Sequence, residues 1–282
     1  MRSRPMAGPG TLSSGGDTSP RADTPNEQRP GPVIILAHAH AGAARLQRLL
    51  SGSPVLACTS GTGLLPLCDQ AAATWRKADN RDNGLSPLAA ASIRALAGSL
   101  ITTFLAAVGG SRWCEVSFSP PGSAETFLQL YPAAKFVCLH RSCPGVIKAG
   151  IQANPWSLAG TAFGRFAAAY PGNSAATIAA YWASRTESLL QFEEAHPSAC
   201  RQVRYEDLAD HRKQEAGKIL AFLNLPADHS APLAQNNHDT TPTAEEPGIP
   251  GRGAEIPIEL IPAPLRARVN DLHARIGYPP IV

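Results

Sequence analysis

Short apolar runs recur along this chain and predict the strands of a buried sheet. The clearest is Val33–Ala37 (VIILA), which follows a proline and contains no polar side chain. Arg112–Ser117 (RWCEVS), Lys135–His140 (KFVCLH) and residues 202–205 (QVRY) are equally short and mostly apolar at their centres. Short runs of this kind are typical of strands that are buried on both faces of a parallel sheet.

Longer segments with helical spacing of apolar residues lie between these runs. Helices are expected over residues 42–50, 64–78, 87–108, 120–130, 145–153, 158–170, 175–196, 208–223 and 264–276. Strands that alternate with helices predict an α/β fold with a central parallel sheet and helices on both faces. The most apolar stretch, residues 95–108, is too short to span a bilayer, so we expect a buried helix there and no membrane contact.

Two segments rich in proline, glycine and small polar residues fall outside this alternation. Residues 1–30 carry too little apolar surface to offset the entropy of ordering, so we expect a disordered tail there. That segment also lacks the apolar stretch of a secretory signal. Residues 226–261 are expected to be irregular. The remainder, residues 31–282, has the length of one α/β domain.

Composition restricts the function mainly by exclusion. The chain is 44% hydrophobic and has a formal net charge of only +3, without a clustered basic face, which argues against nucleic acid as a partner. None of its six cysteines forms a CxxC pair, so buried reduced thiols are expected in place of a zinc site or disulfides. We therefore expect a cytoplasmic protein with a small-molecule ligand and no metal, and leave its oligomeric state open.

The loop after the first strand, residues 38–45 (HAHAGAAR), is the first candidate binding element. Its small residues Ala41, Gly42, Ala43 and Ala44 let a ligand approach the backbone closely. The free N–H groups at the start of the next helix, together with the helix dipole, favour a phosphate. The Walker pattern is absent, and a plain strand–turn–helix connection explains the same residues.

Three further residues are candidates because of their places in the predicted fold. Arg141 directly follows a buried strand, where its guanidinium suits either a phosphate or a neighbouring carboxylate. Tyr205 ends the last strand and could stack on a base or hydrogen-bond to it, whereas Glu206 and Asp207 behind it could simply cap a helix. Arg252 lies in a Gly-Arg-Gly stretch that could close over a ligand or be plain surface.

In order and spacing these segments resemble the PAPS-dependent sulfotransferases, particularly the bacterial and protein-tyrosine branch. PAPS is 3′-phosphoadenosine 5′-phosphosulfate. The resemblance covers about residues 32–278 and is strongest over 32–54, 131–156, 181–210 and 266–279. It implies a P-loop-like sulfotransferase fold that binds PAPS and transfers its sulfuryl group to a hydroxyl or amine.

The first loop departs from the family pattern, which usually reads Pro-Arg-Ser-Gly-Thr-Thr. Gly42 is kept and so are the backbone donors, but alanine takes the three hydroxyl positions, Ala41, Ala43 and Ala44. His40 replaces the basic residue that contacts the 5′-phosphosulfate.

Other family positions are kept in part. Arg141 matches the arginine of the 3′-phosphate site, but the serine expected eight residues later is Ala149. The family often has an acidic residue, a lysine and Ser/Thr-Pro after a tryptophan, and the lysine position looks like Val116. Arg45 is a possible substitute donor, and Arg252 resembles the basic residue of the C-terminal loop that closes on the 3′-phosphate.

The resemblance also suggests catalytic roles. Glu115 is the candidate general base, and an ion pair or an exposed carboxylate is the alternative explanation for it. His40 would neutralise the leaving phosphate, for which it must be protonated; its ordinary pKa is about 6.5.

Three functions remain open on the sequence. The first is a sulfotransferase that moves the sulfuryl group of PAPS to a small molecule in bacterial specialised metabolism. The second is an enzyme on the same scaffold that no longer uses PAPS and catalyses acyl transfer, condensation or cyclisation, for which residues 59–63 (TSGTG) and Cys68 offer hydroxyls and a thiol without a paired base. The third is a non-catalytic binding protein.

Overall fold

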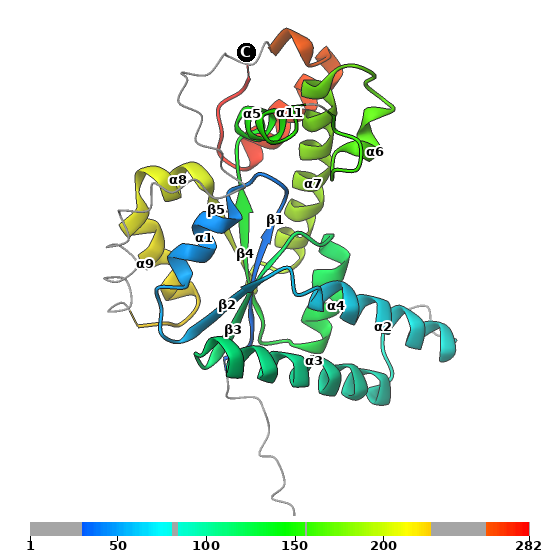
Figure 1. Cartoon of the computed structure of the whole chain (residues 1–282), viewed down its shortest axis with the longest axis vertical. Helices are drawn as coiled ribbons and strands as arrows, with labels where there is room; N and C mark the ends of the chain where they lie inside the picture. The colour runs from blue at the N-terminus through cyan, green and yellow to red at the C-terminus, as the bar shows by residue number, and fades with distance from the viewer. Residues whose placement is uncertain (1–29, 81–83, 156, 227–257, 282) are drawn as a thin grey trace, which may run out of the picture.

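A five-stranded, all-parallel sheet forms the centre of the computed structural model, which describes residues 30–80, 84–155, 157–226 and 258–281. The strand order is β2-β3-β1-β4-β5 (Figure 1). The strands are β1 (Val33–Ala37), β2 (Leu56–Ser60), β3 (Arg112–Ser117), β4 (Lys135–His140) and β5 (Cys200–Arg204). The predicted α/β class is therefore confirmed.

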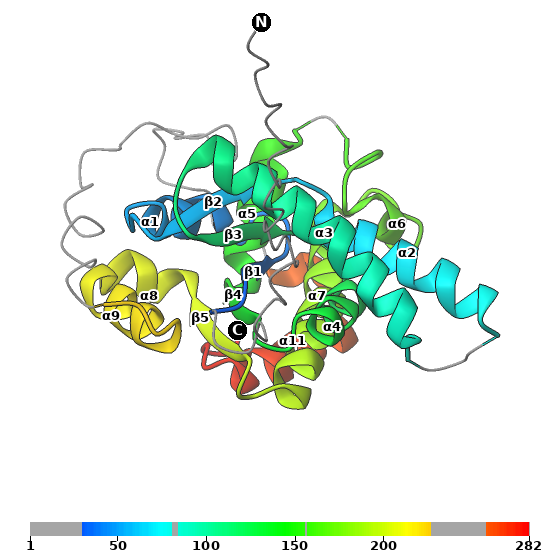
Figure 2. The same cartoon turned by 90° about the horizontal axis from the view of Figure 1, so that it is seen from below.

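Helices cover both faces of this sheet (Figures 1 and 2). They are α1 (Ala43–Leu50), α2 (Leu64–Ala78), α3 (Pro87–Val108), α4 (Pro121–Leu130), α5 (Cys143–Ala153), α6 (Gly164–Ala167), α7 (Ser174–Ala195), α8 (Tyr205–Asp210), α9 (Arg212–Phe222) and α11 (Ala263–Arg275), with a 3₁₀ turn at Ile258–Leu260.

Side-chain alternation along β1 assigns each face its layer. Val33 and Ile35 pack in a core with residues of α1 and α9. Ile34 and Leu36 point to the other face, where they pack with residues of α2, α3, α4 and α7. Because β1 is buried on both faces, its continuous apolar run predicted it correctly.

Two elements differ from the sequence expectations. Strand β2 (LACTS) was not predicted. It lies at the sheet edge, and its last three side chains are half-buried or exposed, so it lacks the apolar run of a central strand. Within residues 158–170 only α6 is helical, a single turn. The expected tail and most of the Pro-rich segment lie outside the described residues.

The prediction that residues 95–108 form a buried helix is wrong. They belong to the 22-residue helix α3, whose most apolar 18-residue window has a mean hydropathy of 1.6 and is only 11% buried. Leu88 and Val108 are 67% and 55% exposed. Within the described residues, α3 alone has the length and composition to cross a membrane, which is weak support for a span. Only Ala89, Ile93 and Ala97 of α3 are fully buried, so a narrow stripe of the helix packs against the rest of the protein.

A buried arginine at the start of β3 links the segment before β1 to the end of helix α9. Arg112 donates hydrogen bonds to the carbonyl oxygens of Gly31 and Leu223, both at 2.6 Å. Since hydrogen bonds to a charged group contribute about 1.5–3 kcal/mol each, Arg112→Met should lower the free energy of unfolding by about 3 kcal/mol in urea denaturation. The exposed Arg94→Met is the control and should change it by less than about 0.5 kcal/mol. Equal losses in both variants would contradict this assignment.

Candidate active site

Three loops leave the carboxyl edge of the sheet together, because β1, β3 and β4 run parallel and adjacent. They span residues 38–42, 118–120 and 141–142. Most of the sequence-predicted candidates that the structure describes lie in or beside these loops.

The first loop presents free backbone amides at the start of α1. His40 and Gly42 both have left-handed backbone conformations, with φ values of 62° and 87°. Among the described residues, the amides of Gly42, Ala43 and Ala44 donate to no partner. Unpaired N–H groups at a helix start attract an anion, as the sequence predicted for this loop.

Hydrogen bonds from neighbouring elements hold the backbone of this loop in place. The amide of Ala39 donates to the hydroxyl of Tyr181 on α7 at 2.9 Å. The Arg141 guanidinium, from the second loop, donates to the carbonyl oxygen of His40 at 2.9 Å. The first and second loops therefore form one unit.

The ring of Tyr205 packs against both of these loops. The guanidinium carbon of Arg141 is 4.3 Å from the centre of the Tyr205 ring and that of Arg45 is 5.7 Å from it. A Cβ at Gly42 would lie 2.2 Å from Cδ2 of the same ring. The four predicted binding residues Gly42, Arg45, Arg141 and Tyr205 thus come together, and Tyr205 acts as a packing surface for the two cations.

The His40 ring is packed against an aromatic side chain and is partly shielded from solvent. It stacks on Phe163, with ring centres 5.6 Å apart, and its Nδ1 is buried without a partner among the described residues. Burial, and then the charge of Arg141, lower the pKa of His40. A protonated His40 therefore needs a nearby anion to raise this pKa again, and its role beside a leaving phosphate stays a prediction.

Ala149 lies on the expected helix face but brings no polar group. It is one turn beyond Gly145 on α5, and a Cβ at Gly145 would lie 3.0 Å from Nε of Arg141. His140, another residue beside the second loop, has its Nε2 2.6 Å from a carboxylate oxygen of Glu193 and faces away from a ligand. Arg252 lies outside the described residues.

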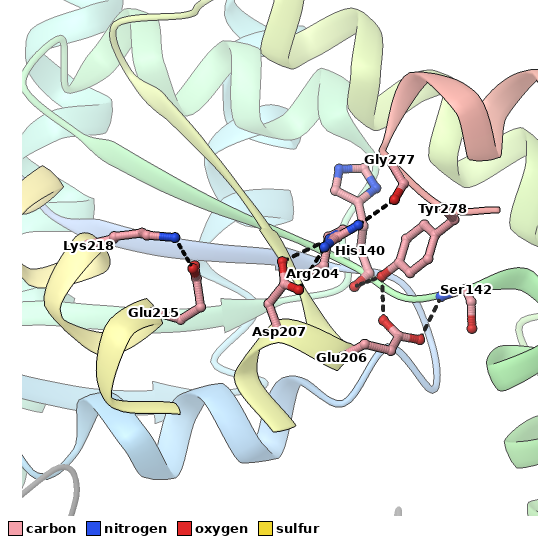
Figure 3. A network of polar contacts seen from close by, with 9 residues as sticks. All are labelled: His140, Ser142, Arg204, Glu206, Asp207, Glu215, Lys218, Gly277 and Tyr278. Atoms are coloured by element: carbon pink, nitrogen blue, oxygen red, sulfur yellow. Dashed lines mark hydrogen bonds and ion pairs between the residues drawn. The ribbon is translucent and has the colours of Figure 1, made fainter. Parts of the chain in front are cut away.

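The carboxylates after Tyr205 anchor the second loop (Figure 3). Glu206 accepts a hydrogen bond from the amide of Ser142 at 3.2 Å and another from the hydroxyl of Tyr278. Asp207 forms a two-pronged ion pair with Arg204 at 2.7 and 2.8 Å. Neither acts as a side-chain cap of α8, which was the alternative that the sequence left open.

Glu115 lies inside β3, where its register partners are Ile34 and Thr59. Its carboxylate accepts hydrogen bonds from the Thr59 hydroxyl at 2.6 Å, the Thr62 hydroxyl at 2.9 Å and the Thr62 amide at 3.0 Å. Burial raises the pKa of Glu115, and the threonine hydrogen bonds oppose that rise. The side chain therefore organises the loop after β2, a role that needed the unpredicted strand β2 to be recognised.

A cavity of about 250 Å³ lies beside Glu115. Its lining comprises Gly61, Gly63, Leu64, Leu65, Pro66, Glu115, Val116, Ser117, Phe118 and Ser119. Gly42 and Arg141 are not among these residues, so Glu115 faces a chamber next to the anion loop. Burial and then Asp69 raise the pKa of Cys68 to about 11, so that cysteine remains a thiol.

Val116, the position at which the family resemblance leads us to expect a lysine, is buried within β3. Phe118, just beyond the strand, is 43% exposed.

Comparison with known proteins identifies the family. The model of the sulfotransferase family matches residues 32–229, which is most of the chain, so the chain belongs to the sulfotransferase family. No curated protein sequence matches it.

Solved structures show the same fold at low identity. The sulfotransferase domain from the curacin biosynthetic pathway has a TM-score of 0.56 at 18% identity, covering 89% of this chain and 98% of that one. The sulfotransferase domain from the Synechococcus PCC 7002 olefin synthase has a TM-score of 0.51 at 16% identity, covering 89% and 97%. A sulfotransferase from Alicyclobacillus acidocaldarius has a TM-score of 0.51 at 15% identity, covering 88% and 96%. The sulfotransferase fold that the sequence predicted is confirmed.

Gly42→Ala should disrupt the anion loop through its contact with Tyr205. The methyl group combines a left-handed residue, which costs about 1–2 kcal/mol, with overlap of the aromatic ring. Gly63→Ala is the matched control, since Gly63 also precedes a helix with φ of 72° but has no atom within 4 Å of the added Cβ. We expect a lower melting temperature for Gly42→Ala than for Gly63→Ala, partly restored by the second substitution Tyr205→Ala. Equal melting temperatures in the two glycine variants would show that the ring contact is unimportant.

His38, at the start of the same loop, should make stability depend on pH. Its Nδ1 lies 3.1 Å from the carbonyl oxygen of Ala39, its Nε2 is buried without a described partner, and burial lowers its pKa to about 3. Because only the unfolded chain binds this proton, stability is lost as pH falls below about 6.5. At about pH 5.5 the loss is about 1.4 kcal/mol. Urea denaturation at neutral pH and at about pH 5.5 measures this loss of stability. The His38→Asn variant should not show the contribution of His38 to the pH dependence. An unchanged pH dependence in the variant would contradict the assignment.

Proposed function

We propose that this chain transfers the sulfuryl group of PAPS to a hydroxyl or amine of a small molecule in bacterial specialised metabolism. The observation that carries the proposal is the first loop, which offers the free amides of Gly42, Ala43 and Ala44 to an anion. Family membership and the likeness to domains from two biosynthetic systems support it. The expectation of a cytoplasmic protein stays part of this proposal.

The residues of the site fit the nucleotide through backbone and arginine, with few hydroxyls. The loop amides would hold the 5′-phosphosulfate, and Arg141, with Arg45 behind the same aromatic ring, would supply positive charge. PAPS brings an activated sulfuryl group on a phosphate leaving group. With Ala41, Ala43, Ala44 and Ala149 in place of hydroxyls, we expect weaker binding than a full set of donors would give.

The neighbouring cavity would accept the small molecule. Its volume of about 250 Å³ suits part of a small acceptor. The acceptor oxygen or nitrogen forms a bond to sulfur, the bond from sulfur to phosphate breaks, and the acceptor proton leaves to a base. Glu115 is the base that we propose, because it lines this cavity and burial raises its pKa.

A second function is favoured by His40, whose ring packs on Phe163 and whose pKa is lowered, and by the buried Val116 at the expected lysine position. These features would suit an enzyme of the same fold that has given up PAPS for acyl transfer, condensation or cyclisation. A cavity that binds without catalysis is the third possibility, and it requires that Glu115 serve only to hold Thr59 and Thr62.

Calorimetric titration with 3′-phosphoadenosine 5′-phosphate (PAP), the nucleotide product of PAPS, separates these functions. We expect micromolar binding that Arg141→Ala abolishes, since this substitution removes a cation and releases the carbonyl of His40. No binding at millimolar ligand would contradict the proposal and favour PAPS-free chemistry in the same cleft.

Arg45 and Arg48 provide a matched pair for the same titration. Both lie on α1, but Arg45 is next to the anion loop and Arg48 is in the last turn. Arg45→Ala should weaken binding of PAP about tenfold, and Arg48→Ala by much less, since the effect of a charge falls off with distance. Equal effects would show that only the net charge of the helix matters.

A further inference from the structure

Arg185 places a cation between the two halves of the site. It projects from α7, and one terminal nitrogen donates to the carbonyl oxygens of Phe118 and Ser119, both at 2.9 Å. Both of those residues line the 250 Å³ cavity. The guanidinium is therefore bound to two residues of the cavity lining, just beyond the end of β3, although Arg185 itself does not line that cavity.

This charge has no carboxylate partner in the described part of the chain. Its two hydrogen bonds go to neutral carbonyls through one nitrogen, and the groups that act on it electrostatically are the Tyr181 hydroxyl and a second cation, Arg165. Burial lowers the pKa of Arg185, yet a guanidinium remains charged. A half-buried arginine without a counter-ion has donors left over that an anion can bind.

The other side of Arg185 faces the first loop. Arg185 and His38 line the same small cavity of about 10 Å³, which has room for a single water molecule. Nε2 of the buried His38 has no partner among the described residues, so a second polar atom at this place is unsatisfied. Tyr181, one helical turn before Arg185, holds the amide of Ala39 in that loop. The cation thus lies between the amides that would hold the donor and the chamber that would hold the acceptor.

We propose that Arg185 binds the sulfuryl group itself during transfer, as the anion-binding residue of the reaction. The proposal rests on the proposed function for the identity of the donor. Guanidinium N–H groups bind the oxygens of a sulfonate as they bind those of phosphate, with short charge-assisted hydrogen bonds.

Two nucleotides that differ only in the sulfuryl group test this role. Dissociation constants for PAPS and for PAP are measured by calorimetry on the full chain and on Arg185→Gln. We expect Arg185→Gln to weaken PAPS about tenfold or more and PAP less than about twofold, because only PAPS carries the group that Arg185 contacts. Equal weakening of both nucleotides, or of neither, would overturn the proposal.

Two control variants distinguish direct contact with the sulfuryl group from other effects of the substitution. Arg165→Gln removes a neighbouring charge and should leave the ratio of the two constants unchanged. Arg185→Lys keeps a cation and should restore part of the preference, even if Arg185→Gln disturbs the loop at Phe118 and Ser119. A ratio that shifts as much in Arg165→Gln as in Arg185→Gln would reduce the effect to general electrostatics and overturn the proposal.

Failure of the proposed function gives a different result. If neither nucleotide binds the unaltered chain, PAPS is excluded as donor, and inorganic sulfate then tests the anion site alone. The site stands if sulfate raises the melting temperature of the unaltered chain more than that of Arg185→Gln at equal ionic strength, and it is overturned if the two shifts agree.

Discussion

The site depends on the placement of one guanidinium. Arg141 leaves β4, bonds the carbonyl of His40 on the loop after β1, and lies on the ring of Tyr205 at the end of β5. Three strands that are adjacent in the sheet thereby present their loops as one surface. Because Tyr205 also closes on the Cα of Gly42, the loop can follow only the path that glycine permits. The geometry of the anion loop is thus determined by groups outside it.

This arrangement explains how a phosphate site can persist after its hydroxyls are lost. Among the standard residues only proline removes a backbone amide donor, and the direction of these amides follows from the left-handed turns at His40 and Gly42. Side-chain hydroxyls add affinity to such a cradle but do not shape it. Alanines at Ala43 and Ala44 therefore reduce the number of donors and leave the cradle intact.

Much of the fold followed from the sequence, and the reasons are physical. Strands buried on both faces, such as β1, show as unbroken apolar runs, whereas the edge strand β2 has polar and half-buried positions and gave no such signal. Helix α3 was placed correctly but assigned to the core, because its composition is apolar and burial depends on which neighbours exist.

The site was predictable to the same limited degree. Residues that follow strands, Arg141 and Tyr205 among them, were found from topology alone. A local sequence pattern does not show that a side chain reaches the site from a distant helix. It also does not show which groups hydrogen-bond to a carboxylate. Glu115 was a candidate base, and its hydrogen bonds to Thr59 of the unpredicted strand β2 and to Thr62 just after that strand could not be predicted.

Under the proposed function, positive charge at this site would come from a helix as well as from the loops. The pKa of His40 on the first loop is lowered, while Arg185 on α7 binds the carbonyl oxygens of Phe118 and Ser119 and has no carboxylate partner in the described residues. A reaction that passes an anion between two partners needs positive potential at the crossing point, whichever element supplies it. A rigid helix can hold that charge more firmly than a loop can, since fewer backbone torsions separate it from the core. The carboxyl edge of the sheet determines where positive charge is needed, and either a loop or a neighbouring helix can supply the side chain that carries it.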